Sequence, residues 1–155
     1  MLNFKGSVNA YRKRSGGLGL VQTNPEPLPG EPAQNLHWSA ELVGQLRRLD
    51  ADWLWLTSWF ELAPLCLDPL LHVRSVGSLP WREDTDQYGK WEALVADQAL
   101  NPRPFVWLED DATSFFDETQ LPVAVSHLVL TPDYQVGVTR AQLEQVKTFL
   151  TSLSN

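Results

Sequence analysis

The chain has 155 residues and a mass of 17.5 kDa, a length that predicts one domain with its own hydrophobic core. Its one cysteine, Cys66, excludes an internal disulfide framework, and no cysteine and histidine cluster has the spacing of a zinc site. A net charge of -7 argues against nucleic acid as a partner, because the field of an acidic domain repels phosphate backbones.

The first quarter of the chain predicts a short strand and then an irregular excursion. Residues 1–9 begin with a very short apolar stretch and turn at Gly6. Residues 10–36 contain four prolines, at positions 25, 27, 29 and 32, a density that excludes a helix or a central strand. A hairpin across residues 11–22, with its tip at Gly16-Gly17, is plausible.

A helix and a buried strand are expected next. Ser39 predicts the N-cap of a helix with an apolar stripe of Leu42, Val43, Leu46 and Leu49. Residues 53–56, WLWL, form a continuous apolar run that is typical of a strand covered on both faces. This strand is expected to end at Thr57-Ser58.

The middle of the chain predicts shorter elements. Residues 60–71 resemble a helix interrupted at Pro64 and Pro69, and residues 72–76 a short strand. A second amphipathic helix is expected from Lys90, with the apolar positions Trp91, Leu94, Val95 and Ala99.

Two further strands and a helix complete the chain. Residues 105–108, FVWL, and residues 123–130 are apolar runs, and the first of them ends in Glu109-Asp110-Asp111. A capping box from Thr139 to Gln142 predicts the start of the last helix. Since strands and helices alternate, the fold class expected is α/β, with three layers around a central parallel sheet of about four strands.

In such a sheet, ligands bind at the carboxyl ends of the strands. The residues expected there include Thr57, Glu109-Asp110-Asp111, Thr131 and Asp133. Adjacent carboxylates at a strand end favour a hard cation such as Mg²⁺. Two structural alternatives stay open: the acidic run as a solvated turn and helix N-cap, and Thr57 as the cap of the next helix.

Taken in order, these segments resemble the haloacid dehalogenase-like (HAD) phosphohydrolase superfamily, and more narrowly its small, compact members in actinobacteria and their phages. The segments that carry the resemblance are LNFKGSVNAYR, LHWSAELVGQLRRL, WLWLTSWF, GKWEALV, RPFVWLEDDA and LVLTPDYQVGVT. The resemblance covers almost the whole chain. It implies a Rossmann-like HAD fold in one domain, residues 1–155, with a flap at about 10–36 inserted after the first strand.

The resemblance also implies roles for particular residues. Thr57 matches the hydroxyl that binds the substrate phosphoryl group, and Lys90 matches the base that neutralises it. Glu109 and Asp110 match the paired acids that hold Mg²⁺ in the family. The residues that would line a phosphate site are therefore expected at the ends of separate strands and at the start of one helix.

The first motif departs from the family. Where the family has Asp-x-Asp-Gly, with a nucleophilic and an acid/base aspartate, this chain has Asn3, Lys5 and Gly6. A carboxamide is a poor nucleophile, and an ammonium group is a poor base at neutral pH. We therefore expect both catalytic positions, Asn3 and Lys5, to be degenerate.

The same substitutions make the site more positive by about three charges, because Asn3 removes one negative charge and Lys5 changes the charge by two. The need for a metal falls accordingly. One hypothesis is that Lys5 pairs with Glu109 or Asp110 where Mg²⁺ would sit. The alternative is that Lys5 points into solvent from a loop.

The function expected is that of a catalytically impaired or inactive HAD-like protein, a binding module that uses the old active-site cleft. Its partner is expected to be a protein or a small phosphate-containing ligand, with neither nucleic acid nor membrane. The alternative is a Mg²⁺-dependent phosphohydrolase with residual activity by another route. Since no targeting signal is recognised and no apolar run reaches the ~20 residues of a membrane span, a cytoplasmic location is expected.

Overall fold

A computed structural model describes residues 20–23, 36–57, 59–81, 88–122, 124–133 and 136–154. Asn3, Lys5 and most of the flap predicted at 10–36 lie outside these residues. The helices are α2 (Ala40–Leu46), α3 (Leu62–Leu71), α4 (Tyr88–Leu100), α5 (Ala112–Phe115) and α6 (Arg140–Leu153), with a 3-10 turn at Glu118–Gln120. The strands are β1 (Leu20–Thr23), β2 (Leu36–Ser39), β3 (Trp53–Trp55), β4 (Ser75–Ser78), β5 (Phe105–Leu108) and β6 (His127–Leu130).

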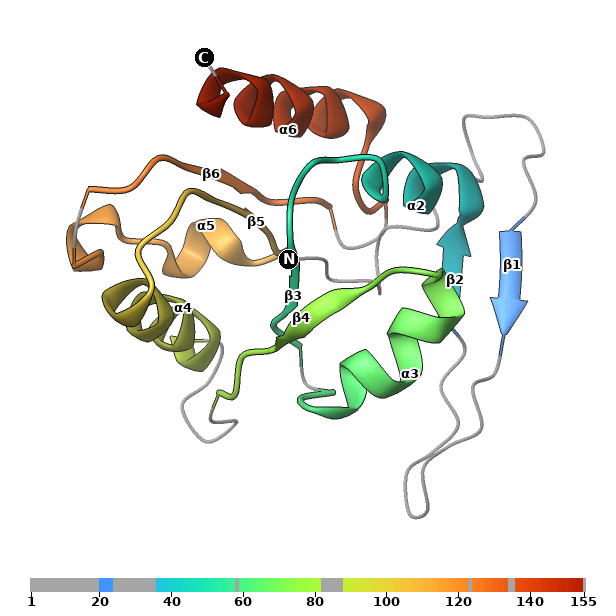
Figure 1. The fold of residues 1–155 in the computed structure, drawn as a ribbon, viewed down its shortest axis with the longest axis horizontal. Coiled ribbons are helices and arrows are strands. Elements are labelled where there is room, and N and C mark those ends of the chain that lie inside the picture. Colours follow the sequence, from blue (N-terminus) through green and yellow to red (C-terminus); the bar gives the residue numbers. More distant parts are fainter. Residues whose placement is uncertain are drawn as a thin grey trace.

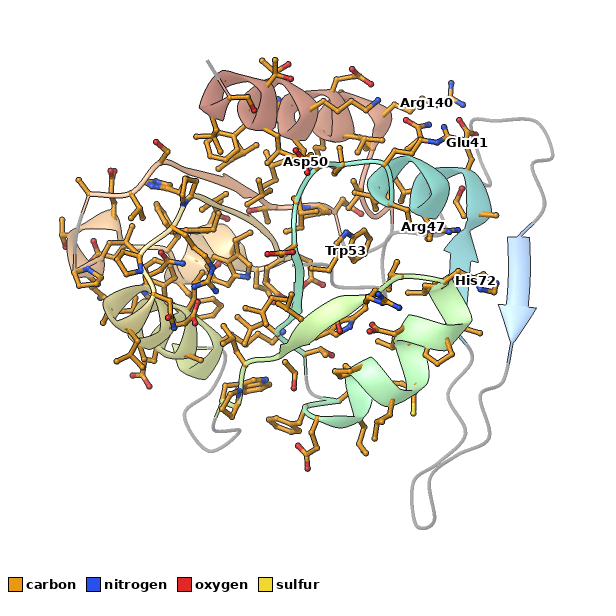
Figure 2. All side chains as sticks on the ribbon, in the orientation of Figure 1. Glu41, Arg47, Asp50, Trp53, His72 and Arg140 are labelled. Carbon is orange, nitrogen blue, oxygen red and sulfur yellow. The ribbon has the colours of Figure 1, made fainter. Side chains whose placement is uncertain are left out.

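Two helix starts form as the sequence predicts. The Ser39 side chain accepts a hydrogen bond from the Leu42 amide at 3.2 Å, which caps α2. Thr139 and Gln142 bond reciprocally at the start of α6, so the predicted capping box is confirmed. Arg140, the first residue of α6, also pairs with Glu41 of α2 at 3.0 Å, and the two side chains meet in Figure 2.

The two prolines do not interrupt α3, so that part of the prediction is wrong. Pro64 lies in the first turn of Leu62–Leu71, where the amide would have no acceptor within the helix. Pro69 lies in the last turn, and its missing hydrogen bond would have used the carbonyl of Leu65, whose residue is 69% exposed. The helix ends at His72, which takes a left-handed conformation.

The predicted central sheet of about four parallel strands is wrong. Among the described residues, β3 pairs with β4 and β5 pairs with β6, each in parallel, while β1 and β2 form an antiparallel pair. The hairpin predicted across 11–22 lies mostly outside the described residues and stays a prediction, and its described end belongs to Leu20–Thr23, which pairs with Leu36–Ser39. Figure 1 shows the two parallel pairs as separate units, with α3 beside β4 and α4 and α5 near β5.

The sheet prediction was wrong because a run of apolar residues indicates that a strand is buried. It does not indicate which strand edges pair. Alternate residues of β5 enter two different apolar clusters: Leu108 packs with α2, α3 and α6, and Trp107 packs with α4 and α5. Both faces of β5 are therefore covered, and the apolar pattern is satisfied without a ladder to β3. A cavity of about 560 Å³ lies between β3 and β5. Residues of both strands line it, including Trp55 and Trp107.

Candidate functional site

The carboxyl ends of β5 and β6 lie side by side, as the strand-end argument requires. Leu108 is in register with Leu130, and the amide of Glu109 donates to the Leu130 carbonyl at 3.2 Å. The residues that follow these strands line one open hollow of about 500 Å³: Asp110, Asp111, Thr131, Pro132 and Asp133. The predicted strand-end residues of β5 and β6 are thus brought together.

Lys90 and Glu109, 19 residues apart in the chain, form a partly buried ion pair. The Nζ atom of Lys90, in the first turn of α4, lies 3.0 Å from Oε2 of Glu109, directly after β5. The Glu109 side chain is 5% exposed and that of Lys90 is 14% exposed, so water screens this pair poorly. The site therefore has a desolvated cation with an internal counter-ion.

The pKa of the Glu109 carboxyl group is shifted toward neutral pH. Burial raises its pKa from 4.5 to about 7, because a desolvated carboxylate is unfavourable. A hydrogen bond with the side chain of Asp110 raises the pKa further, and the charge of Lys90 opposes both effects. Near pH 7, Glu109 can therefore take up or release a proton.

Thr57 joins this cluster through Trp81. The indole Nε1 of Trp81 donates to the Thr57 carbonyl at 3.1 Å, and the Trp81 ring lies 5.7 Å from the Lys90 Nζ atom. The Thr57 hydroxyl accepts a 3.4 Å hydrogen bond from the Trp59 amide, so this side chain also caps the turn before α3. We call Thr57, Trp81, Lys90 and Glu109 the Lys90 cluster.

Asn3 and Lys5 lie outside the described residues. The hypothesis that Lys5 pairs with Glu109 or Asp110 therefore stays a prediction. Within the described part of the chain, the ammonium group placed against Glu109 is that of Lys90.

The ion pair with Lys90 means that a cation such as Mg²⁺ would have to compete for the Glu109 carboxylate. One oxygen of Glu109 contacts the Lys90 ammonium group at 3.0 Å, which a second cation would have to displace. Among the residues described, no group of three or more histidine, cysteine, aspartate and glutamate side chains could hold a metal ion.

Trp81 and Phe60 lie at the candidate site, and the sequence prediction did not include them. Trp81 is only half-buried and contacts both Thr57 and Lys90. Phe60 packs against the Trp81 ring in a tilted arrangement, with ring centroids 5.5 Å apart. Periodicity carries no signal for either residue, because both lie outside the helices and strands.

Comparisons with protein-family models, with curated proteins and with solved structures gave no match. Within the described residues, no helix is both long enough and apolar enough to cross a membrane.

Proposed function

We propose that this protein binds a small phosphate-containing ligand at the Lys90 cluster and does not hydrolyse it. The observation that carries the proposal is the contact between Lys90 and Glu109, which places a desolvated ammonium group beside the ends of two parallel strands. An ammonium group in such a place attracts phosphate more strongly than one in water. Of the two ligand classes expected from the sequence, this contact favours the phosphate-containing one.

Glu109 is a counter-ion of Lys90 that can lose its negative charge by taking up a proton. When a phosphate dianion approaches Lys90, the negative charge of Glu109 becomes unfavourable. Because its pKa is already about 7, Glu109 can become neutral by taking up one proton. Lys90 is then available to the ligand without leaving a buried carboxylate unpaired.

The absence of hydrolysis is proposed from the sequence. The resemblance assigns the nucleophile and the acid/base to positions 3 and 5, which are Asn3 and Lys5 in this chain. Neither side chain can replace a carboxylate in covalent phosphoryl transfer at neutral pH. A ligand held by Lys90 would therefore keep its phosphate group.

We expect no turnover of p-nitrophenyl phosphate above the buffer rate, with or without millimolar Mg²⁺. The assay measures released p-nitrophenol for the wild-type protein and for Glu109→Ala, with Glu144→Ala as an exposed control. Mg²⁺-dependent turnover that is lost in Glu109→Ala and kept in Glu144→Ala would refute the non-hydrolytic proposal. That result would favour the phosphohydrolase alternative.

A further inference from the structure

Trp81 contacts the Lys90 cluster at two separate points. Its indole N–H donates to the Thr57 carbonyl at 3.1 Å, which fixes the ring relative to the loop after β3. Its ring lies 5.7 Å from Lys90 Nζ, within the range of a cation–π interaction. One side chain therefore links the loop after β3 to the start of α4.

The loop side of this link is itself constrained. The Thr57 carbonyl also accepts the Phe60 amide at 3.0 Å, and Phe60 has φ of 46°, a left-handed conformation that a bulky residue rarely adopts. The Phe60 ring packs on Trp81 at 5.5 Å with an interplanar angle of 33°. The turn thus presents one carbonyl and one ring to Trp81, and both limit its movement.

The Lys90 side of the link does not depend on a carboxylate. A lysine side chain has many rotamers, and ordering it costs conformational entropy. Glu109 holds the ammonium group by charge, and a phosphate ligand competes for that same charge. The attraction of the Trp81 ring remains when Glu109 is neutral, so it can hold Lys90 in place while the counter-ion changes.

We propose that Trp81 is a positioning residue that holds the Lys90 ammonium group and the Thr57 loop in one arrangement for phosphate binding. This inference rests on the proposed function for its ligand. Its geometric part, the placement of Lys90 by Trp81, can be tested without a ligand.

The variants are Trp81→Leu, which removes the ring and the N–H, and Trp81→Phe, which keeps an aromatic ring and loses only the N–H. Trp53→Leu is the matched control, because Trp53 is also half-buried and packs against the other apolar cluster. Inorganic phosphate is the probe, titrated by calorimetry at pH 7. We expect affinity to fall about fivefold in Trp81→Leu and by less in Trp81→Phe. Trp53→Leu should bind as the wild type does.

A second readout reports the position of Lys90 directly. Reductive methylation with ¹³C-formaldehyde labels the four lysines of the chain and keeps their positive charge. The Lys90 signal, identified by its loss in Lys90→Met, should be shifted upfield by the ring current of the aromatic side chain at position 81, in the wild type and in Trp81→Phe. It should move to the position of an exposed lysine in Trp81→Leu.

The two readouts separate the possible failures. If the wild type does not bind phosphate, the proposed function fails, and the methyl signal alone decides the role of Trp81. If phosphate binds equally to the wild type and Trp81→Leu, or the Lys90 signal is the same in both, the positioning role of Trp81 is wrong. If phosphate affinity falls equally in Trp81→Phe, Trp81→Leu and Trp53→Leu, the effect is general destabilisation, which also overturns the inference.

Discussion

Replacing Asp68 with alanine is expected to lower the free energy of unfolding by about 3 kcal/mol. The Asp68 carboxylate, in α3, accepts the indole N–H of Trp55 at 2.7 Å and both the amide and the hydroxyl of Ser75 at 2.8 Å. Trp55 is 1% exposed, so its N–H would lose its Asp68 partner in a place where water cannot easily replace it. One carboxylate thus joins α3 to β3 and β4, and β3 leads directly into Thr57.

For a domain of this size, the loss corresponds to a melting temperature lower by about 10 °C in differential scanning calorimetry. Glu144→Ala is the matched control, because its carboxylate is 67% exposed and pairs with Lys147 on the same helix at 2.7 Å. This control should cost less than about 0.5 kcal/mol. Equal melting temperatures for Asp68→Ala and Glu144→Ala would show that the three contacts of Asp68 do not hold the β3–β4 pair to α3.

Replacing Glu109 with glutamine is expected to change stability in a pH-dependent way. The folded state raises the pKa of Glu109 from 4.5 to about 7, chiefly by burial, and so holds the proton more tightly than the unfolded state does. The stability that Glu109 contributes is therefore full below pH 4.5 and is lost as pH rises through about 7. At about 1.4 kcal/mol per pH unit, the loss reaches about 3 kcal/mol at pH 8.

Glutamine imitates the neutral carboxyl group, since its oxygen can accept from Lys90 and its amide can donate to Asp110. Urea unfolding at pH 4.5, 6, 7 and 8 should show Glu109→Gln gaining stability relative to the wild type as pH rises. Glu144→Gln, at an exposed site, should show no such trend. A wild-type protein that becomes more stable than Glu109→Gln between pH 6 and 8 would mean that Lys90 outweighs burial at this carboxyl group.

The helices were largely predictable because their signals are local. Ser39 and the Thr139 capping box supply hydrogen-bond acceptors to amides within three residues, and that geometry depends on no distant part of the chain. Pro64 and Pro69 were misjudged because the cost of a proline depends on its position in the helix. In the first turn, the amide that proline lacks would have had no acceptor within the helix. In the last turn, a proline costs one hydrogen bond near the helix end and does not divide the helix.

Strand pairing was not predictable in the same way. The runs at 53–56 and 105–108 correctly predicted β3 and β5, but a buried strand can be covered by helices on its two faces without pairing to a particular neighbour. β6 begins at His127, whereas the apolar run predicted a start at residue 123. Strand pairing and strand ends depend on the hydrogen bonds that the backbone edges form. Side-chain hydrophobicity does not indicate those hydrogen bonds.

The candidate site was partly predictable for a related reason. Glu109 and Asp110 directly follow β5, where the sequence predicted a strand end, while their roles stay predictions. The contact of Lys90 with Glu109 depends on how α4 lies against β5, which no local pattern reports. Trp81 could not be found in this way, because the role proposed for it depends on one hydrogen bond with Thr57 and one ring contact with Lys90, which only the folded chain shows. A half-buried tryptophan outside any regular element carries no periodic pattern.

Calorimetric titration with inorganic phosphate at pH 7, without Mg²⁺, tests most directly whether the Lys90 cluster binds phosphate. We expect saturable binding to the wild type that weakens about tenfold in Lys90→Met, since a charge-assisted hydrogen bond is lost. Lys147→Met is the matched control, because Lys147 lies on α6 and pairs with Glu144. It should bind phosphate as the wild type does. The proposal is contradicted if the wild type shows no saturable binding, or if Lys90→Met binds phosphate as tightly as Lys147→Met.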